Sequence, residues 1–397
     1  MKICIVTPKV SRNDGQGRVN YELALYLATA GHQVSLLAMK IDSALGKASN
    51  LSCQELSPPA WIPTALLRNQ WFALRSRQWI RRRAQDFDII HLNGSLSYYP
   101  ADINASHFVH ANWLKSVYHP SKSFGGIYAG YQWLYTKLNA VWEQKAYHSA
   151  AIVVAVSDFV RDSLIQDVNL PPSQVKTILN GVDIQEFAPL KSGDDNFLSK
   201  ELSVPEDSFF IFFSGGIRTN RKNLDLVIKA LTHLDSSFHL VVAGSNSGSP
   251  YPAMARELNV SKQVHFLGHR TDISTLLRCA NAFAFPSHYD PYPLSVLEAL
   301  ASGVPVITAP SVGSSALIQS GVNGFLLKHS NDLEGMVASL SYLAKEPESA
   351  AQIARAGRQT AEDLSWEKMG KRYENLYHEV YLKKQNYLLS GAVTNSP

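Results

Sequence analysis

KICIVTPKVSRNDGQGRVNYELALYLATAGHQVSLLAM, at residues 2–39, sets the alternation that decides the fold. Its first apolar run, residues 3–7, is rich in β-branched side chains and predicts a buried strand. A polar, glycine-bearing loop follows. The apolar residues of 19–30 then recur at helical spacing, with Gly31 where a helix-ending glycine belongs, and residues 34–38 predict a second strand. Strand, helix and strand in this order form a βαβ unit, which implies a parallel sheet with a right-handed crossover.

The rest of the chain repeats this alternation in two halves, separated by a polar stretch at residues 189–205. Further strands of the first half are predicted at residues 88–92, 103–106 and 152–155. The second half is predicted to hold a strand at 209–214, a helix at 224–234, and strands at 240–243, 264–267, 282–285 and 304–308.

We therefore predict an α/β chain of two Rossmann-like doubly wound domains, residues 1–188 and 189–364, followed by a C-terminal helix and tail, residues 365–397. Two such domains that face each other hold a ligand in the cleft at the carboxyl ends of their strands. Apolar side chains recur every three or four residues between positions 366 and 381, so we expect a helix there that crosses back to the first domain.

The composition excludes several classes of protein. With 397 residues, 45% of them hydrophobic and 18% charged, the chain is an ordinary globular protein of two or three domains and not a collagen-like or disordered one. Its net charge, 37 − 33 = +4, is too small for a dedicated nucleic-acid binder. The positive charge is uneven, because residues 1–190 carry 18 − 13 = +5 and residues 191–397 carry 19 − 20 = −1.

Three scattered cysteines, Cys4, Cys53 and Cys279, are too few for a disulfide framework or a zinc ribbon, and no His/Cys cluster has metal-ligand spacing. No run approaches the ~20 apolar residues of a membrane span, and the first apolar run is too short for a signal peptide. The acidic pair at Asp86 and Asp88 lies at the entrance of a strand, opposite the expected site, so we interpret it as polar caps. We expect a cytoplasmic protein that binds no metal.

The most informative motif is PSHYDPYPLSVLEALASG at residues 286–303, which follows a buried strand. A helix that starts just after Asp290 presents unpaired N–H groups and its positive end to the site, which suits an anion such as phosphate. Glu298 lies about one and a half turns into this helix, and helical side chains lean towards the N-terminus. Asp290 and Glu298 can therefore bracket one ligand. The alternative interpretation is an ordinary strand–loop–helix unit with solvated acids.

A second candidate is the basic loop GGIRTNRKN at residues 215–223, which follows the first strand of the second half. A diphosphate gains negative charge as it leaves, so fixed cations at this position stabilise the transition state more than the ground state. The alternative interpretation is a solvated basic loop.

Taken in order, these motifs resemble those of the family-4 glycosyltransferases, which are retaining enzymes with the two-domain GT-B fold. Asp290 and Glu298 match the E-x7-E signature, with Asp in the first position. Residues 178–183, ILNGVD, match the segment between the family's two domains, and residues 215–223 match its glycine–basic donor loop. The resemblance covers nearly the whole chain, and the set of motifs is specific although each motif alone is weak.

The resemblance implies roles for the residues around the second motif. Glu298 would hold the ribose hydroxyls of the nucleotide, and Asp290, one methylene shorter than the usual Glu, would contact the transferred sugar. Tyr292, Pro293 and Leu294 occupy the position of the family's F-G-L, whose backbone amides cradle the diphosphate. Because proline has no N–H group, Leu294 and Ser295 would have to supply more of the donors.

In the donor loop, the resemblance makes Lys222 the phosphate-binding lysine, with Gly216 at the donor as well. An arginine usually assists the lysine, and we prefer Arg218 to Arg221 because it lies nearer to the end of the strand. Asn223 replaces the family's common glycine after the lysine.

The first domain would also contribute to the site. Gly15 and Gly17 resemble the family's first glycine-rich loop, where glycine lets the backbone approach a ligand closely. The family also has a histidine at the end of a strand in this domain, which contacts the sugar. Residues 105–110, ASHFVH, fit that position, and we choose His107 over His110. The alternative interpretation is a structural histidine.

We therefore expect a retaining, metal-independent glycosyltransferase without a cofactor. Such an enzyme moves a sugar from a nucleotide-diphosphate donor to a hydroxyl group of a glycan or glycolipid acceptor, as in the synthesis of cell-surface polysaccharide, lipopolysaccharide or glycolipid. Lys222, Arg218, Asp290 and His107 would be its catalytic residues, and closure of the two domains over the donor would assemble the site. Two alternatives stay open: a sugar-nucleotide epimerase of the same architecture, and a non-catalytic module that binds a sugar nucleotide or a membrane.

Two further stretches concern the acceptor. Between Arg68 and Arg83, six arginines alternate with aromatic residues, a composition that suits an anionic membrane surface, although a solvated helix with core aromatics is the alternative. This stretch makes a peripheral membrane location part of the hypothesis. Residues 113–138 are rich in Tyr and Trp and could stack on a sugar, face lipid or form core.

Overall fold

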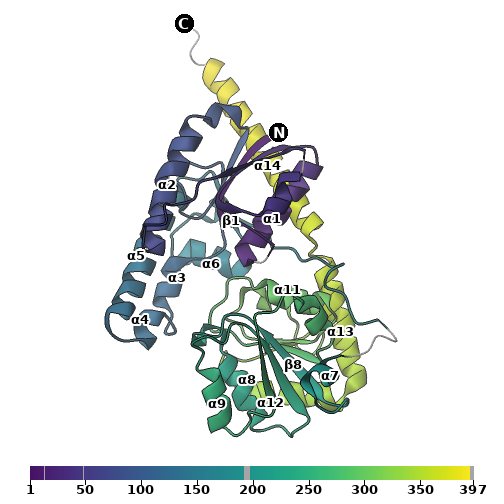
Figure 1. The fold of residues 1–397 in the computed structure, drawn as a ribbon. Coiled ribbons are helices and arrows are strands. Elements are labelled where there is room, and N and C mark those ends of the chain that lie inside the picture. Colours follow the sequence, from purple (N-terminus) through teal and green to yellow (C-terminus); the bar gives the residue numbers. More distant parts are fainter. Residues whose placement is uncertain (13, 48, 192–196, 394–397) are drawn as a thin grey trace. The chain divides into compact units, whose positions relative to one another are not determined.

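The computed structural model describes residues 1–12, 14–47, 49–191 and 197–393. The chain folds into two compact units: unit 1 comprises Met1–Gly181 and the chain from Trp366 onward, and unit 2 comprises Val182–Ser365 (Figure 1). The chain thus enters unit 2 seven residues before the predicted boundary after residue 188 and returns to unit 1 at the start of the last helix.

Unit 1 is built on a parallel sheet of seven strands in the order β3-β2-β1-β4-β5-β6-β7. The strands are β1 (Lys2–Val10), β2 (Gln33–Ile41), β3 (Leu51–Glu55), β4 (Ile89–Asn93), β5 (Ile103–Ser106), β6 (Ile152–Ala155) and β7 (Val175–Thr177). The central strand β1 pairs on both sides, so that Ile5 lies opposite Leu36 of β2 and His91 of β4. The βαβ unit predicted from residues 2–39 is confirmed.

Two strands of this sheet have no counterpart in the sequence-based prediction. Most side chains of β3 are exposed, because it is an edge strand, and it therefore lacks the apolar pattern that marks a buried strand. At three residues, β7 is too short to show a period.

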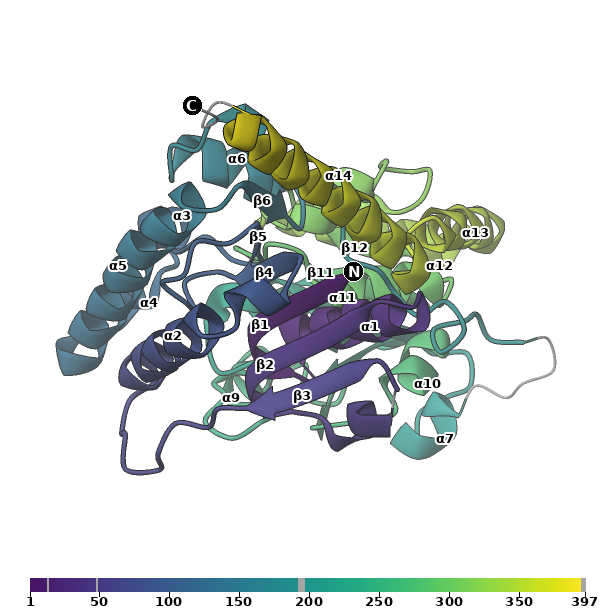
Figure 2. The same cartoon turned by 90° about the horizontal axis from the view of Figure 1, so that it is seen from above.

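The helices of unit 1 are α1 (Gly15–Thr29), α2 (Ala65–Arg81), α3 (His110–Lys115), α4 (Pro120–Ser123), α5 (Gly126–His148), α6 (Asp158–Gln166) and α14 (Trp366–Val393), with short 3₁₀ turns at η1 (Ser43–Lys47), η2 (Ala84–Asp86) and η3 (Pro172–Gln174). The helix α1 starts at Gly15 because the side chain of Asp14 caps it, accepting a 2.7 Å hydrogen bond from the backbone N–H of Gly17. Figure 2 shows unit 1 from above, with the sheet between its helices.

The C-terminal helix α14 packs onto the sheet of unit 1, as expected from the sequence. The ring of Tyr373 stacks on His91 at 5.6 Å, and the hydroxyl of Tyr377 lies 2.6 Å from Nδ1 of the same histidine, which is buried in β4. Further along, Glu374 lies 2.9 Å from Nε2 of His32. Burial lowers the pKa of His91 to about 3, so this histidine is neutral and serves as an anchor for α14.

Unit 2 is built on a parallel sheet of six strands in the order β10-β9-β8-β11-β12-β13. The strands are β8 (Phe209–Ser214), β9 (Phe238–Ala243), β10 (Val264–Gly268), β11 (Ala282–Phe285), β12 (Val306–Thr308) and β13 (Phe325–Leu326). The helices are α7 (Leu198–Leu202), α8 (Leu224–Leu231), α9 (Tyr251–Glu257), α10 (Ile273–Arg278), α11 (Leu294–Ala301), α12 (Leu333–Lys345) and α13 (Pro347–Glu362), with 3₁₀ turns at η4 (Asn220–Lys222) and η5 (Gly313–Leu317).

The core of unit 2 fixes the ends of its central strands. Phe213 of β8 and Phe285 of β11 are buried, and their rings stack at 6.0 Å. Because β8, β11 and β12 are parallel neighbours, the loops that follow them start at one edge of the sheet. The predicted fold class, two Rossmann-like units with parallel sheets, is confirmed. None of the described helices combines the length and apolar character needed to cross a membrane.

Candidate functional site

Two predicted site residues form an ion pair at this edge of the unit 2 sheet. Lys222 comes from the loop after β8 and Asp290 from the loop after β11, and Nζ of the lysine contacts Oδ2 of the aspartate directly. Their side chains are only 14% and 9% exposed. A second cation, Nη1 of Arg221, lies 3.9 Å from the same carboxylate oxygen. Two cations thus face one carboxylate, which leaves a net positive charge for an anionic ligand.

The loops that carry this pair are held by backbone hydrogen bonds. The carbonyl of Arg221 accepts hydrogen bonds from the N–H of His288 at 2.9 Å and from the hydroxyl of Ser287 at 2.8 Å. The carbonyl of Asp290 accepts from the N–H of Gly313 at 2.7 Å, at the start of η5. The three loops after β8, β11 and β12 therefore position one another, which preorganises the charges.

The environment of Lys222 weakens its hold on a proton. Burial lowers the pKa of its ammonium group and nearby Arg221 lowers it further, while the charge of Asp290 acts in the opposite direction. The ammonium nitrogen also lies 4.7 Å from the centroid of the Phe285 ring, a cation–π contact that favours the charged form.

Asn223, the residue after the lysine, adopts a backbone conformation that explains why the family often has glycine there. Its φ of 57° is in the left-handed region, which asparagine tolerates better than other non-glycine residues. The buried side chain donates hydrogen bonds from Nδ2 to the carbonyl of Pro286, at 3.1 Å, and to the carbonyl of Ser330. Asn223 therefore ties the donor loop to the start of the loop that carries Asp290.

The helix α11 begins at Leu294, after Pro293, and among the described residues no side chain caps it. Leu294 and Ser295 are half-buried and provide its first two backbone N–H groups, while Tyr292 is buried. Glu298 is half-buried in the second turn of the same helix. The predicted residues of this motif thus lie at the helix N-terminus that follows Asp290.

The remaining residues of the donor loop lie apart from the ion pair. Arg218 is exposed and lies beside Gly248: a Cβ atom at that glycine would be 3.8 Å from Nε of the arginine. Gly216 is exposed as well. Gly215 has a φ of +144° and lies against the stem of Lys222. The structure therefore brings Arg221, and not the preferred Arg218, next to Lys222 and Asp290.

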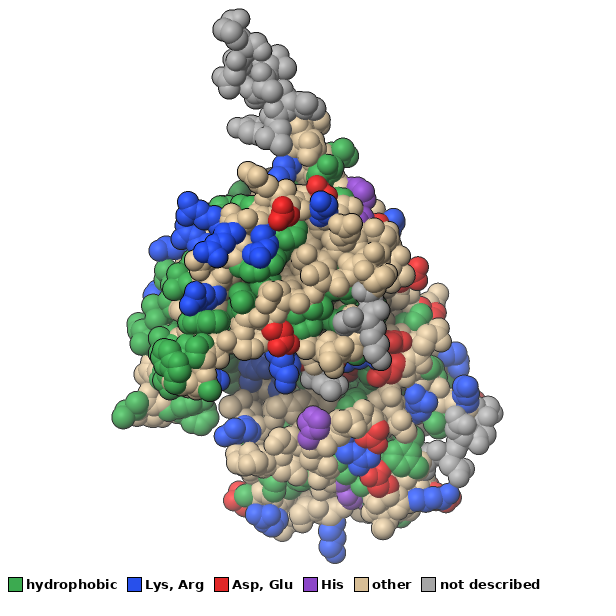
Figure 3. All heavy atoms as spheres, turned by 45° about the horizontal axis from the view of Figure 1, so that its top comes forward, with side chains coloured by type: hydrophobic (Ala, Val, Ile, Leu, Met, Phe, Trp, Pro, Cys, Tyr) green, Lys and Arg blue, Asp and Glu red, His purple; other side chains and the backbone are tan. Residues whose placement is uncertain are grey.

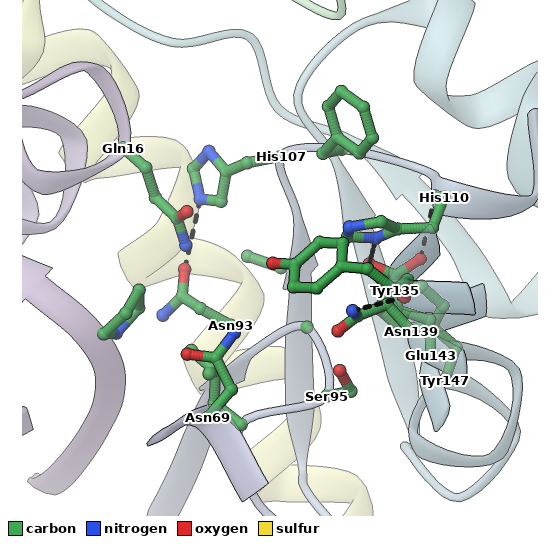
Figure 4. A pocket seen from close by; sticks show the side chains of 15 residues that line it. Gln16, Asn69, Asn93, Ser95, His107, His110, Tyr135, Asn139, Glu143 and Tyr147 are labelled. Carbon is green, nitrogen blue, oxygen red and sulfur yellow. Dashed lines mark hydrogen bonds and ion pairs between the residues drawn. The ribbon is translucent and has the colours of Figure 1, made fainter. Parts of the chain in front are cut away.

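Unit 1 has a pocket of about 150 Å³ near the carboxyl ends of β4 and β5 (Figure 4). His107 lies at this pocket, with Nε2 3.1 Å from Oδ1 of Asn93, and Gln16 of the first glycine-rich loop lies beside them. Burial lowers the pKa of His107 to about 4, partly offset by the charge of Asp14, so the ring is neutral near pH 7. Gly15 and Gly17 flank Gln16 in the first turn of α1.

The sequence-based prediction missed a second histidine of this pocket and its partner. Nδ1 of His110 lies 2.6 Å from Oε1 of Glu143, and the backbone N–H of His110 donates to Oε2 of Glu143 at 3.0 Å. Glu143 is buried in α5. It is also the one acidic residue in the sequence from 103 to 157, a signal that could have identified it. Amide and hydroxyl side chains complete the lining: Asn69, Asn93, Ser95, Tyr135, Asn139 and Tyr147.

Unit 1 also brings together one group of residues with metal-ligand side chains. Atoms of His32, Glu374 and His378 lie within 4.8 Å of one another. The carboxylate of Glu374 already accepts hydrogen bonds from Lys371 at 2.8 Å and from Tyr26 at 3.2 Å. These protein partners satisfy the carboxylate as a brace between α14 and α1. The absence of a metal from the reaction stays a prediction.

Comparison with known proteins identifies the family. Residues 13–186 match the model of Glycosyltransferase Family 4, and residues 194–360 match that of Glycosyl transferases group 1. The chain belongs to the family-4 glycosyltransferases. Among curated relatives of this glycosyltransferase, the D-inositol 3-phosphate glycosyltransferase of Saccharomonospora viridis is 28% identical over 272 residues, 65% of this chain and 62% of the relative. The match thus spans less than two thirds of the relative's length.

Solved structures similar to this glycosyltransferase share its fold. Sucrose-phosphate synthase from Thermosynechococcus elongatus superposes with a TM-score of 0.79 at 18% identity, over 96% of this chain and 99% of that one. Anabaena HepE, solved in complex with UDP and glucose, gives 0.72 at 18% identity, over 96% and 100%.

Proposed function

We propose that this family-4 glycosyltransferase moves a sugar from a nucleotide-diphosphate donor to a hydroxyl group of a glycan or glycolipid, with retention of configuration and without a metal ion. The observation that carries the proposal is the arrangement of Lys222 and Arg221 around Asp290, beside the start of α11. Support for a nucleotide donor also comes from the HepE complex, whose ligands are UDP and glucose.

In this proposal the leaving diphosphate takes the place of Asp290 as the partner of Lys222. Charge accumulates on the diphosphate as the sugar leaves, so the two cations stabilise the transition state more than the bound donor. The N–H groups of Leu294 and Ser295 add fixed dipoles at the end of α11. Arg218 and Gly216 would contact the donor from the outer part of the loop.

Asp290, once released from Lys222, would accept hydrogen bonds from hydroxyl groups of the transferred sugar. Glu298 would hold the ribose hydroxyls, because a carboxylate accepts two hydrogen bonds from a vicinal diol. We propose that substitution takes place on the same face of the sugar, with the leaving phosphate accepting the proton of the acceptor hydroxyl. No metal is required in this scheme, since the lysine and arginine neutralise the phosphate charge.

The unit 1 pocket would take part of the acceptor and the reacting end of the sugar. Its lining of amides, hydroxyls and neutral His107 can donate and accept hydrogen bonds with an uncharged polyol. The single buried acid, Glu143, is already engaged by His110. Such a site suits a glycan or the sugar headgroup of a glycolipid, and thus a reaction in cell-surface polysaccharide, lipopolysaccharide or glycolipid synthesis on the cytoplasmic side of a membrane.

The test is an incubation of the protein with a panel of nucleotide sugars, with and without a cell-envelope extract as acceptor. Release of nucleotide that depends on the extract supports transfer, and analysis of the product's anomeric configuration tests retention. Isomerisation of the donor without an acceptor would instead indicate an epimerase. Tight donor binding without turnover, with any of the sugars and extracts, would indicate a non-catalytic module.

A further inference from the structure

One side of unit 1 carries cations with almost no balancing acids. Residues 56–85 contain six arginines and no Asp or Glu, and all six arginines are exposed. Residues 103–157 contain four lysines and one acid, Glu143, which is buried in the pocket. The helices α2 to α5, which these residues form, therefore present cations to solvent without a neighbouring carboxylate from their own segments.

These two basic segments are neighbours in space. The helices α2 and α5 run side by side in both ribbon views (Figures 1 and 2). Asn69 of α2 and Tyr135 of α5 line the same pocket (Figure 4). In the space-filling view, Lys and Arg side chains gather on this side of unit 1 next to a patch of hydrophobic ones (Figure 3).

The hydrophobic patch comes from the turn between α4 and α5 and from the first half of α5. Ile127 is 94% exposed, and Phe124, Tyr128 and Trp133 are each about half exposed. The rings of Phe124 and Tyr128 contact each other edge to face at 5.4 Å instead of packing into the core. A group of large apolar side chains kept in water marks an interaction surface.

We propose that the docking surface, formed by the arginines of α2 and the apolar side chains around Phe124, Ile127, Tyr128 and Trp133, binds an anionic lipid bilayer. Arginine attracts anionic headgroups, whereas Trp, Tyr and Ile enter the boundary between headgroups and acyl chains. A nucleic acid would match the cations but leaves the apolar side chains in water. Both properties together fit the bilayer.

The docking surface also specifies the class of acceptor. The polyol-binding pocket lies between α2 and α5, the two helices that carry the surface. A sugar headgroup that projects from the bilayer would meet this pocket, so the acceptor is lipid-linked. This second part rests on the proposed glycosyl transfer, whereas bilayer binding does not.

The first experiment measures co-sedimentation of the full chain with vesicles. Vesicles of phosphatidylcholine alone are compared with vesicles that contain 30% phosphatidylglycerol, at low and high salt. We expect binding to the anionic vesicles that weakens with salt. The triple variant Arg75→Gln, Arg77→Gln, Arg81→Gln should bind them roughly tenfold or more weakly, because each basic residue near the surface contributes to partitioning.

Matched controls separate local from general charge effects. Lys262→Gln, Lys345→Gln, Arg355→Gln removes the same charge from exposed positions of unit 2 and should bind vesicles like the wild type. Ile127→Ser with Trp133→Ser should weaken binding even at low salt, while Val322→Ser with Leu382→Ser, at apolar positions elsewhere, should not. Circular dichroism and thermal unfolding confirm that each variant is folded.

The outcomes are decisive for the bilayer. Absence of binding to anionic vesicles at low salt, or equal binding by the arginine variant and its control, would overturn the proposal. So would binding to heparin or DNA without binding to vesicles, which would indicate a polyanion partner.

A second readout separates the lipid proposal from the proposed function. The arginine variant should transfer sugar to acceptor lipids in vesicles more slowly than its control, yet hydrolyse the donor in the absence of acceptor at an unchanged rate. Equal transfer by the two variants to vesicle lipids would refute the lipid-linked acceptor. Loss of all donor turnover in the wild type, with vesicle binding intact, would refute the glycosyl transfer and leave the docking surface standing.

Discussion

The ammonium group of Lys222 and the carboxylate of Asp290 form a direct ion pair, although 68 residues separate them in the sequence. Both side chains are largely buried, so bulk water offers neither of them an alternative partner. A diphosphate that enters this site competes with Asp290 for Lys222. The pair therefore braces two loops in the free protein and, in the proposed reaction, opens when the donor binds.

Lys222→Ala should lower the turnover number at saturating donor by about 10²–10³-fold, the usual effect of removing one preorganised charge stabiliser. It also leaves Asp290 buried without its partner, so thermal unfolding has to show that the variant is folded at the assay temperature. Lys229→Ala, which removes an exposed lysine of α8, is the matched control and should be fully active. A Lys222→Ala enzyme as active as this control would refute the site assignment.

Asp290→Asn should move the alkaline limb of the pH–rate profile to lower pH. The charge of Asp290 raises the pKa of Lys222, whereas burial and Arg221 lower it. Removal of the carboxylate charge therefore lowers this pKa further, and the ammonium form is lost at a lower pH. The measurement is donor turnover from pH 6 to 10, normalised to each variant's maximum, with Asp235→Asn as a surface control. Superimposable profiles would show that Asp290 does not tune the lysine.

Asn223→Ala should destabilise the protein more than Asn223→Gly. Alanine at a φ of 57° costs about 1–2 kcal/mol, and both variants lose the side-chain hydrogen bonds to Pro286 and Ser330. Glycine restores the backbone freedom only, so chemical denaturation should rank the stabilities wild type, glycine, alanine. Asn220→Ala, at an exposed position of the same turn, should have little effect. The reverse order for the two Asn223 variants would contradict a role for backbone conformation.

Glu143→Gln should impair acceptor use while sparing the donor site. One amide oxygen cannot accept from both the backbone N–H and the ring of His110, so one buried donor is left unpaired at a cost of about 1–3 kcal/mol. We expect a KM for acceptor raised about tenfold, in proportion to a loss of about 1.4 kcal/mol in binding, and an unchanged rate of donor hydrolysis. Gln144→Ala, at the adjacent exposed position, is the control. An unchanged acceptor KM would show that His110 and Glu143 have a purely structural role.

Treatment with EDTA should leave the transfer rate unchanged, because in the proposed reaction Lys222 and Arg221 neutralise the phosphate charge. The measurement compares initial rates before chelation, after dialysis, and after addition of Mg²⁺ or Mn²⁺. A loss of activity that added Mg²⁺ or Mn²⁺ restores would refute metal independence.

The sequence predicted the central parts of both sheets, because their strands are buried and lie between helices of clear period. It also predicted the ends of β8 and β11 as the donor site, since a basic loop and a helix start follow those strands. It could not rank Arg218 against Arg221. Position along a loop does not reveal which side chain turns towards Asp290, and here that is Arg221.

The contacts between distant segments were beyond the sequence for a similar reason. Glu143 and His110 lie on different helices, 33 residues apart, and no local period links them. The edge strand β3 lacks the apolar alternation on which strand prediction depends. The exposure of Ile127 and Phe124 was equally hidden, because an apolar helix face looks the same in sequence whether core or water covers it.

The return of α14 to unit 1 has a consequence for protein synthesis. A chain that emerges from the ribosome completes Val182–Ser365 before it has made the helix that Tyr373 and Tyr377 anchor on His91. Domains fold as units once their sequence is available. Unit 2, although second in the sequence, is therefore the first whose residues are all present, and nascent unit 1 keeps the His91 face of its sheet uncovered until translation is nearly finished. A chaperone that shields apolar surface would find its binding site there.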